Sequence, residues 1–152
     1  RTFSKLSPPL RTEDDRKHII KGIKDGTIDA IVSDHTPHDQ DAKRLPFNQA
    51  EFGGIGLETL LPLTLKLVKN ENLDLIRAIS LISKNPSKIL GLETGRLNLK
   101  SEADLIVFDL EKPWKIKSED FHSKSKNSPF DSILVEGKNL MTFVRGRLVF
   151  QS

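Results

Sequence analysis

Residues 28–39 read IDAIVSDHTPHD, a short apolar run followed directly by a carboxylate and two imidazoles. Residues 28–33 are few, rich in β-branched side chains and bounded by glycine and a polar loop, which predicts a buried strand. Asp34, His35 and His38 would then follow the carboxyl end of that strand. Barrel enzymes present metal ligands and proton-transferring groups at this edge, so we expect a candidate site there.

The chemistry of this motif leaves two interpretations open. A carboxylate beside a divalent metal stays ionised, can ligate the metal and can accept a proton from metal-bound water, so Asp34 suits a general base in hydrolysis. His38 lies four residues on and could hold a carboxylate or an oxyanion of a substrate. The alternative is a plain turn in which the aspartate only caps the backbone. A hydrolytic metal site needs three or more protein ligands, and we identify no others in the sequence.

The composition excludes several classes of protein. With 152 residues, 36% hydrophobic and 30% charged, the chain is predicted to be globular and large enough for one domain with a core. The net charge of +3 comes from 24 basic and 21 acidic residues that are interspersed, so we expect no nucleic-acid partner. The absence of cysteine excludes disulfides, thiol catalysis and Cys-ligated zinc, and fits a cytoplasmic location. No apolar run reaches transmembrane length, so no membrane association is expected.

The pattern of elements changes along the chain. Residues 1–92 are predicted to alternate strands and helices, and residues 93–152 to be mainly β. The first helix should follow Thr12, a good N-cap with Asp15 at the capping-box position. It should end before Gly26.

The loop at residues 34–55 is long for a connection, which is typical of functional or disordered segments. Phe47 and Phe52 are its expected anchors. The other elements expected are a strand at residues 2–6, helices at residues 57–68 (with Pro62 near the start), at residues 73–83 (capped by Asn72) and from Pro86 to Gly91, and strands at residues 103–108, 132–135, 141–144 and 147–150, with turns at residues 136–139 and 145–146.

Neither part is expected to close by itself. The first offers too few strands for a barrel of eight strand–helix units, and the second too few for a self-sufficient sandwich. The sequence also starts at Arg1, directly before the strand expected at residues 2–6, so we expect the start to be a cut or a processing site.

Short motifs through nearly the whole chain resemble those of dihydroorotase, the zinc amidohydrolase that interconverts carbamoyl aspartate and dihydroorotate in pyrimidine synthesis. Each motif alone is common, but their order and spacing together are specific. The motifs are KLSPPLR at residues 5–11, SDHTPH at 33–38, FGGIGLET at 52–59, NP at 85–86, GL at 91–92, GRL at 95–97, ADLIVFD at 103–109, NSPF at 127–130 and VRGR at 144–147.

The resemblance implies an α/β fold, the C-terminal portion of a (β/α)₈ TIM-type metal-dependent hydrolase barrel plus part of a small β-sandwich. Residues 1–92 would supply the last strands and helices of the barrel. Residues 93–152 would supply the C-terminal segment of a composite sandwich, which in the family also takes strands from the N-terminus.

The resemblance also assigns roles at the candidate site. Asp34 stands at the place of the metal-linked aspartate, which contacts the zinc site and relays a proton during ring opening or closure. His38 matches the histidine that helps to hold the substrate carboxylate, and Phe52 and Gly53 match the loop whose backbone meets the pyrimidine ring. Ser7 stands where the family has a substrate-binding asparagine, and its hydroxyl lacks the paired geometry of an amide.

The remaining histidines carry no such role. His35 follows the aspartate and should point the other way. His18 lies in the first helix and His122 in a late loop, and both are expected at the surface or in packing. We expect a structural role for Arg11.

Zinc is the cofactor that the resemblance implies. The family's other ligands, a His-x-His pair, a bridging modified lysine or aspartate and two further histidines, lie upstream in the family, and no His-x-His occurs in this sequence. We therefore expect a chain that is inactive by itself, from an enzyme acting on dihydroorotate or carbamoyl aspartate. The alternative is a non-catalytic chain that assembles with an N-terminal half or with a copy of itself. Hydantoinase-type and allantoinase-type relatives share the barrel, so the sequence leaves undecided which cyclic amide is the substrate.

Overall fold

Residues 2–152 are described by a computed structural model, and contacts divide the chain into two compact units. The assignment of residues 1–92 to a barrel and 93–152 to a sandwich is not tested by this division and stays a prediction. Each unit draws on separate stretches of the chain: unit 1 holds the N-terminal segment through Ile28, residues 32–60 and residues 115–134, and unit 2 holds residues 29–31, 61–114 and 135–152.

The first helix of unit 1, α1 (Glu13–Asp25), has the ends that the sequence predicts. The amide of Asp15 donates to Thr12 Oγ1 over 3.3 Å, and the Thr12 amide donates to Asp15 Oδ2 over 3.1 Å. This reciprocal capping box satisfies two amides that have no helical partner. Gly26 ends the helix at φ 91°, where a residue with a Cβ would be strained.

Two predicted strands are not formed. Residues 2–6 contain the 3₁₀ helix η1 (Thr2–Ser4), so the strand expected there is wrong. Residues 28–33 belong to no strand, and the amide of Ile31 donates to the carbonyl of Leu81 in a helix. A strand exists only through hydrogen bonds to a neighbour, and none runs beside this segment within residues 2–152. One isolated parallel bridge follows it, between His35 and Gly54.

The long loop at residues 34–55 contains a short helix, α2 (Gln40–Arg44). The carboxylate of Asp39 caps it by accepting from the amide of Ala42 over 2.8 Å. The remaining element of unit 1 is the 3₁₀ helix η2 (Ser118–Asp120). The small apolar core of this unit comprises Ile23, Ala50, Ile55, Ile116 and Phe121.

The three helices predicted for residues 57–91 are present, with shifted starts. Helix α3 (Leu60–Glu71) begins after a turn, and Pro62 lies in its first turn, where a missing amide breaks no helical bond. Helix α4 (Leu75–Ile82) is capped by Asp74, not by the expected Asn72. Helix α5 is Lys84–Ile89.

The start of α5 differs from the prediction in one detail. Pro86 is the third residue of the helix, whereas the sequence predicted it at the first helical position. Gly91 follows the helix with φ 68°, as expected for its terminator. None of the helices in residues 2–152 has the length and apolar character to cross a membrane.

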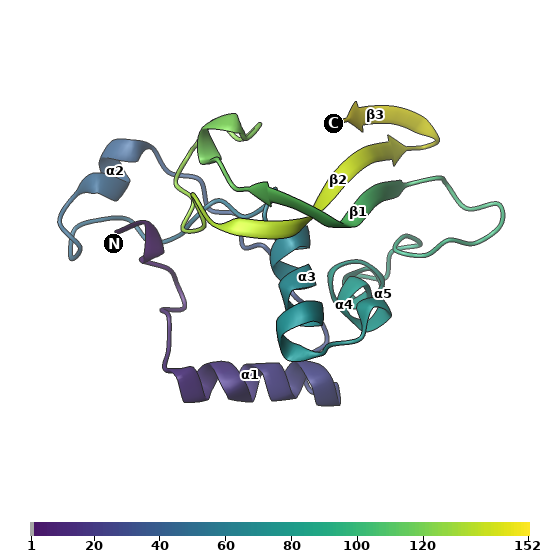
Figure 1. The fold of residues 1–152 in the computed structure, drawn as a ribbon, viewed down its shortest axis with the longest axis horizontal. Coiled ribbons are helices and arrows are strands. Elements are labelled where there is room, and N and C mark those ends of the chain that lie inside the picture. Colours follow the sequence, from purple (N-terminus) through teal and green to yellow (C-terminus); the bar gives the residue numbers. More distant parts are fainter. Residues whose placement is uncertain (1) are drawn as a thin grey trace. The chain divides into compact units, whose positions relative to one another are not determined.

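The β part of unit 2 is a three-stranded sheet of order β1-β2-β3, visible in Figure 1. Its strands are β1 (Leu105–Lys115), β2 (Leu134–Val144) and β3 (Arg147–Gln151). Strands β2 and β3 are antiparallel, and the predicted turn at Arg145-Gly146 joins them.

Strand β2 corrects the sequence prediction, because the strands expected at residues 132–135 and 141–144 form one element without a turn at 136–139. Gly137 has φ 86° and lies against Leu65, where a Cβ would collide with the leucine Cδ1. Glycine at this position therefore allows strand β2 to approach Leu65 of helix α3 closely. The unit 2 core comprises Leu65, Leu73, Ala78, Leu81 and Val135.

Candidate functional site

Asp34 lies in unit 1, directly after residues 28–33, and it is exposed. Its φ of 43° is left-handed, a conformation in which aspartate and asparagine are enriched. Thr36 Oγ1 donates to the Asp34 carbonyl over 3.0 Å and fixes the turn. Since Asp39 is the residue that caps α2, the carboxylate of Asp34 is not used as that cap.

His38 is joined to the predicted loop at Phe52. Its Nε2 lies 2.8 Å from the Phe52 carbonyl, which can only accept, so Nε2 carries the proton. In the neutral ring Nδ1 is then left as an acceptor. The structure thus brings together two of the residues that the sequence predicted for the site.

Gly53 is required as glycine by its conformation and by its surroundings. Its φ is 112°, and a Cβ would lie 2.6 Å from both Cβ and Cγ2 of Thr36. Its amide donates to the Lys5 carbonyl over 2.9 Å. The Phe52-Gly53 loop therefore packs directly on the segment that follows Asp34.

His35 holds the same loop from another direction. Its Nδ1 accepts from the amide of Gly56 over 3.2 Å, so this nitrogen carries no proton. The ring therefore has a defined partner in the backbone of this loop. The expectation that His35 takes no part in zinc binding stays a prediction. His18, on the exposed surface of α1, lies with Nδ1 2.7 Å from the Asp14 carbonyl.

Ser7 lies in the exposed loop that the sequence predicted at residues 7–11. The peptide bond between Ser7 and Pro8 is cis. Lys5, two residues earlier, accepts through its carbonyl from Gly53, which ties this loop to the Phe52-Gly53 loop. Arg11 forms an exposed ion pair of 3.6 Å with Asp15, and such pairs contribute little to stability.

Two buried lysines were missed by the sequence analysis. Lys43 is fully buried, and its Nζ donates to the carbonyls of Lys5, Glu51 and Gly53 over 3.2, 2.7 and 2.8 Å. Burial is the main cause that lowers its pKa, the charge of Lys5 lowers it further, and Glu51 opposes the shift. Lysines are almost never fully buried, so the sequence carried no signal for this position.

Lys5 explains how the two phenylalanines anchor the loop. It is 8% exposed, and its Nζ donates to the carbonyls of Asn48 and Ala50 over 3.2 and 2.7 Å. The same ammonium lies 4.3 Å from the ring centroid of Phe52 and 5.4 Å from that of Phe47. Both rings are at least half exposed, so they anchor the loop through the cation and not through burial.

Asn127 is a further residue whose role the sequence did not reveal. It is fully buried, its Nδ2 donates to the Thr36 carbonyl over 3.1 Å, and its Oδ1 accepts from the His38 amide over 3.2 Å. Its carbonyl accepts from the amide of Ile55 over 3.2 Å. One side chain therefore fixes the backbone on both sides of Pro37. Its only sequence signal was membership of the NSPF motif.

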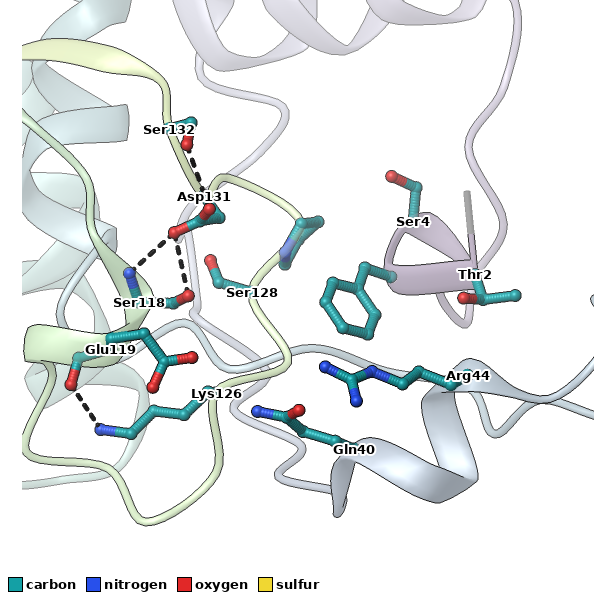
Figure 2. A pocket seen from close by; sticks show the side chains of 12 residues that line it. Thr2, Ser4, Gln40, Arg44, Ser118, Glu119, Lys126, Ser128, Asp131 and Ser132 are labelled. Atoms are coloured by element: carbon teal, nitrogen blue, oxygen red, sulfur yellow. Dashed lines mark hydrogen bonds between the residues drawn. The ribbon is translucent and has the colours of Figure 1, made fainter.

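A cavity of about 410 Å³ in unit 1 lies outside these residues. Figure 2 shows Asp131 accepting from the amide and hydroxyl of Ser118, over 2.8 and 2.9 Å, and from Ser132 Oγ over 3.1 Å. Lys126 donates to the Glu119 and Phe121 carbonyls over 3.0 and 2.7 Å. These charged groups are satisfied by the protein itself, and no predicted site residue lines the cavity.

The residues present do not make a complete metal site. Across residues 2–152, no three side chains of histidine, cysteine, aspartate or glutamate are placed to hold a metal ion together. Asp34 can supply one carboxylate ligand, whereas a catalytic zinc needs three protein ligands and an open position. Zinc therefore does not fit this set of residues alone.

Comparison with known proteins places this geometry in a family. Residues 6–149 match the amidohydrolase family. The chain is 46% identical to the dihydroorotase of Anaplasma phagocytophilum (strain HZ) over 151 residues, which are 99% of this chain and 34% of that protein. It is also 46% identical to the dihydroorotase of Geobacter sp. (strain M21), covering 99% of this chain and 36% of that protein. The chain thus spans about a third of the length of the curated relatives it matches.

Solved structures agree on the fold. The L-hydantoinase (dihydropyrimidinase) of Arthrobacter aurescens matches with a TM-score of 0.90 and 33% identity, over 97% of this chain and 34% of that one. The dihydropyrimidinase of Brevibacillus agri NCHU1002 matches with a TM-score of 0.90 and 24% identity, over 99% of this chain and 34% of that one. At this identity the match supports the fold alone. The expected fold class, a portion of an α/β metal-dependent hydrolase barrel with part of a β-sandwich, is confirmed. The chain belongs to the amidohydrolase family.

Proposed function

We propose that this chain forms one part of the active site of a dihydroorotase-type cyclic amidohydrolase, which interconverts dihydroorotate and carbamoyl aspartate. The observation that supports it most is the bond between His38 and the Phe52 carbonyl, because it joins the two loops for which the substrate contacts were predicted. The identity to curated dihydroorotases over nearly the whole chain supports the same substrate class.

In this proposal Asp34 moves the proton. Ring opening joins the oxygen of water to the amide carbon, breaks the carbon–nitrogen bond and leaves a proton of that water on the ring nitrogen. The exposed carboxylate of Asp34 takes the proton from the attacking water and delivers it to the nitrogen. Zinc would polarise the carbonyl and activate the water, with its other ligands lying outside these residues.

His38 and its neighbours would hold the substrate. While Nε2 donates to the Phe52 carbonyl, a substrate carboxylate can be bound only by a proton on Nδ1, so the ring must then be doubly protonated. The Gly53 amide already donates to the Lys5 carbonyl, so it is not available to the substrate. Each carbonyl of the loop still has a second lone pair, which could accept a hydrogen bond from the ring of the substrate. Ser7 would add one hydroxyl contact.

The second candidate, a non-catalytic chain that acts by assembly with a partner, is favoured by its uncovered apolar residues. Leu97 and Leu99 are 85% and 97% exposed, and Leu148 and Val149 on β3 are 48% and 59% exposed. An N-terminal half or another copy of the chain could cover them. Measuring the solution mass of the purified chain tests this candidate, and a stable monomer would count against it.

The catalytic proposal is tested in two steps. The chain alone should bind no stoichiometric zinc and hydrolyse no dihydroorotate, and turnover by it would contradict the proposal. A chimera in which this chain replaces the matching segment of the Geobacter dihydroorotase should be active. In that chimera Asp34→Asn should lower kcat about 100-fold or more, the usual contribution of a general base.

Asparagine is the appropriate replacement because it tolerates the left-handed backbone of Asp34, whereas alanine would add strain. The matched control is Asp41→Asn, which neutralises an exposed carboxylate on α2 in the same loop. Unchanged kcat in Asp34→Asn, or equal losses in both variants, would refute the role as proton relay.

A further inference from the structure

Lys43 places a buried positive charge against the Phe52-Gly53 loop, whose Phe52 carbonyl contacts His38. Its ammonium donates to three carbonyls, those of Lys5, Glu51 and Gly53, which matches the three protons that an ammonium carries. The side chain is fully buried. No carboxylate oxygen is among these three acceptors, so the charge is held by backbone dipoles of two separate loops.

The position of these acceptors sets the direction of the carbonyl between them. The carbonyls of Glu51 and Gly53 are both fixed on Lys43, and the carbonyl of Phe52 accepts from His38 Nε2. If the ammonium is removed, the carbonyls of Glu51 and Gly53 lose this donor. The Phe52-Gly53 peptide group then keeps only the bond from the Gly53 amide to the Lys5 carbonyl beside its bond to His38. The bond to His38 therefore loses part of its support.

A purely stabilising role explains this arrangement poorly. Burial and the neighbouring charge of Lys5 lower the pKa of Lys43, so carrying the charge inside the fold costs free energy. Buried charges often add no net stability compared with apolar replacements, although removing one partner leaves the others unsatisfied. What the ammonium does provide is one fixed geometry for three carbonyls.

We infer that Lys43 is a positioning residue for substrate binding, which holds the Phe52-Gly53 loop against His38. The inference rests on the proposed function, because the loop matters only if the substrate binds there. Lys43 touches no reacting atom in this assignment. It acts through Phe52 and Gly53, so its loss should weaken binding of the substrate more than it slows the chemical step.

The test uses the active chimera, with Lys43→Met to keep the length of the side chain without its charge. KM for dihydroorotate should rise about tenfold, the worth of one charge-assisted hydrogen bond, while kcat changes less than about threefold. Hydrogen–deuterium exchange should rise in residues 36–39 and 48–56 only. The matched control is Lys69→Met, which removes an exposed ammonium paired with Glu136 on the surface and should change neither quantity.

Three results would overturn the inference: an unchanged KM, unchanged exchange in the two loops, or exchange that rises throughout the chain, which would indicate global destabilisation. Lys43→Gln keeps two amide donors and should give a smaller rise in KM. It decides the question if the methionine variant does not fold. If the unsubstituted chimera is inactive, the proposed function fails, and the exchange measurement still decides whether Lys43 holds the loop.

Discussion

Replacing Asn127 by alanine should strongly destabilise unit 1, because it removes two hydrogen bonds from a fully buried amide. The substitution removes the bonds to the Thr36 carbonyl, over 3.1 Å, and to the His38 amide, over 3.2 Å. Both lie in the segment that follows Asp34. The expected consequence is greater mobility of residues 36–38 at the candidate site, where the bond from His38 Nε2 to the Phe52 carbonyl remains.

The magnitude follows from those two bonds. Each contributes about 1 kcal/mol net, and a buried backbone group left without a partner costs about 1–3 kcal/mol. Thr36 and His38 are only half-buried and can recruit water in part, so the free energy of unfolding should fall by about 2–4 kcal/mol. With a urea m-value of about 2 kcal/mol/M, the unfolding midpoint should move down by about 1–2 M.

Urea unfolding followed by far-ultraviolet circular dichroism measures this change, with Asn139→Ala as the matched control. Asn139 makes one side-chain bond, from Nδ2 to Thr142 Oγ1 over 2.8 Å, and its buried Oδ1 has no partner among the residues that the structure describes. Its removal should therefore cost less than about 1 kcal/mol. If Asn127→Ala costs no more than Asn139→Ala, the claim that Asn127 fixes the loop is refuted.

Two further changes test the loop and the cavity. Gly53→Ala adds a clash with Thr36 to an unfavourable φ, so it should destabilise by about 2–4 kcal/mol, whereas Gly146→Ala, with φ 74° and no neighbour near its Cβ, should cost about 1 kcal/mol in the same urea assay. The pKa of Asp131 lies below its usual 3.8 mainly because the Ser118 amide donates to it, so its contribution to stability should be present above pH 3.8 and be lost as the pH falls through the lower folded value. Asp131→Asn should weaken the loss of unfolding free energy at acidic pH. An unchanged dependence of stability on pH in this variant would contradict the contribution of Asp131.

The elements that the sequence predicts correctly are those with local causes. The capping box of Thr12 and Asp15 and the terminator Gly26 lie within one helix, and each is recognisable from its neighbours. The turn at Arg145-Gly146 is equally local. In all these cases the interaction that fixes the backbone lies within a few residues of it, so pattern and structure agree.

The misses have distant causes. Gly137 suggests a turn from sequence, but its positive φ goes with close packing on Leu65, which lies in another element. The apolar run at residues 28–33 has a strand pattern, but within residues 2–152 no strand runs beside it. Lys43 lies in the short helix α2 and Asn127 in an irregular segment. Only the folded backbone supplies the carbonyls and amides that allow these polar residues to be buried.

Lys43 and Asn127 also explain why the backbone of the candidate site is already fixed in the absence of a substrate. Lys43 fixes the carbonyls on either side of Phe52, and Asn127 fixes the amide of His38. Both supports lie inside unit 1, as do Asp34 and Gly53, so the proposed substrate contacts are set by this unit itself. Metal binding, in contrast, needs ligands that residues 2–152 do not bring together. It follows that ordering of the His38–Phe52 contact should not depend on zinc, whereas turnover should. A chimera stripped of zinc by a chelator should therefore lose activity and keep slow hydrogen exchange in residues 48–56.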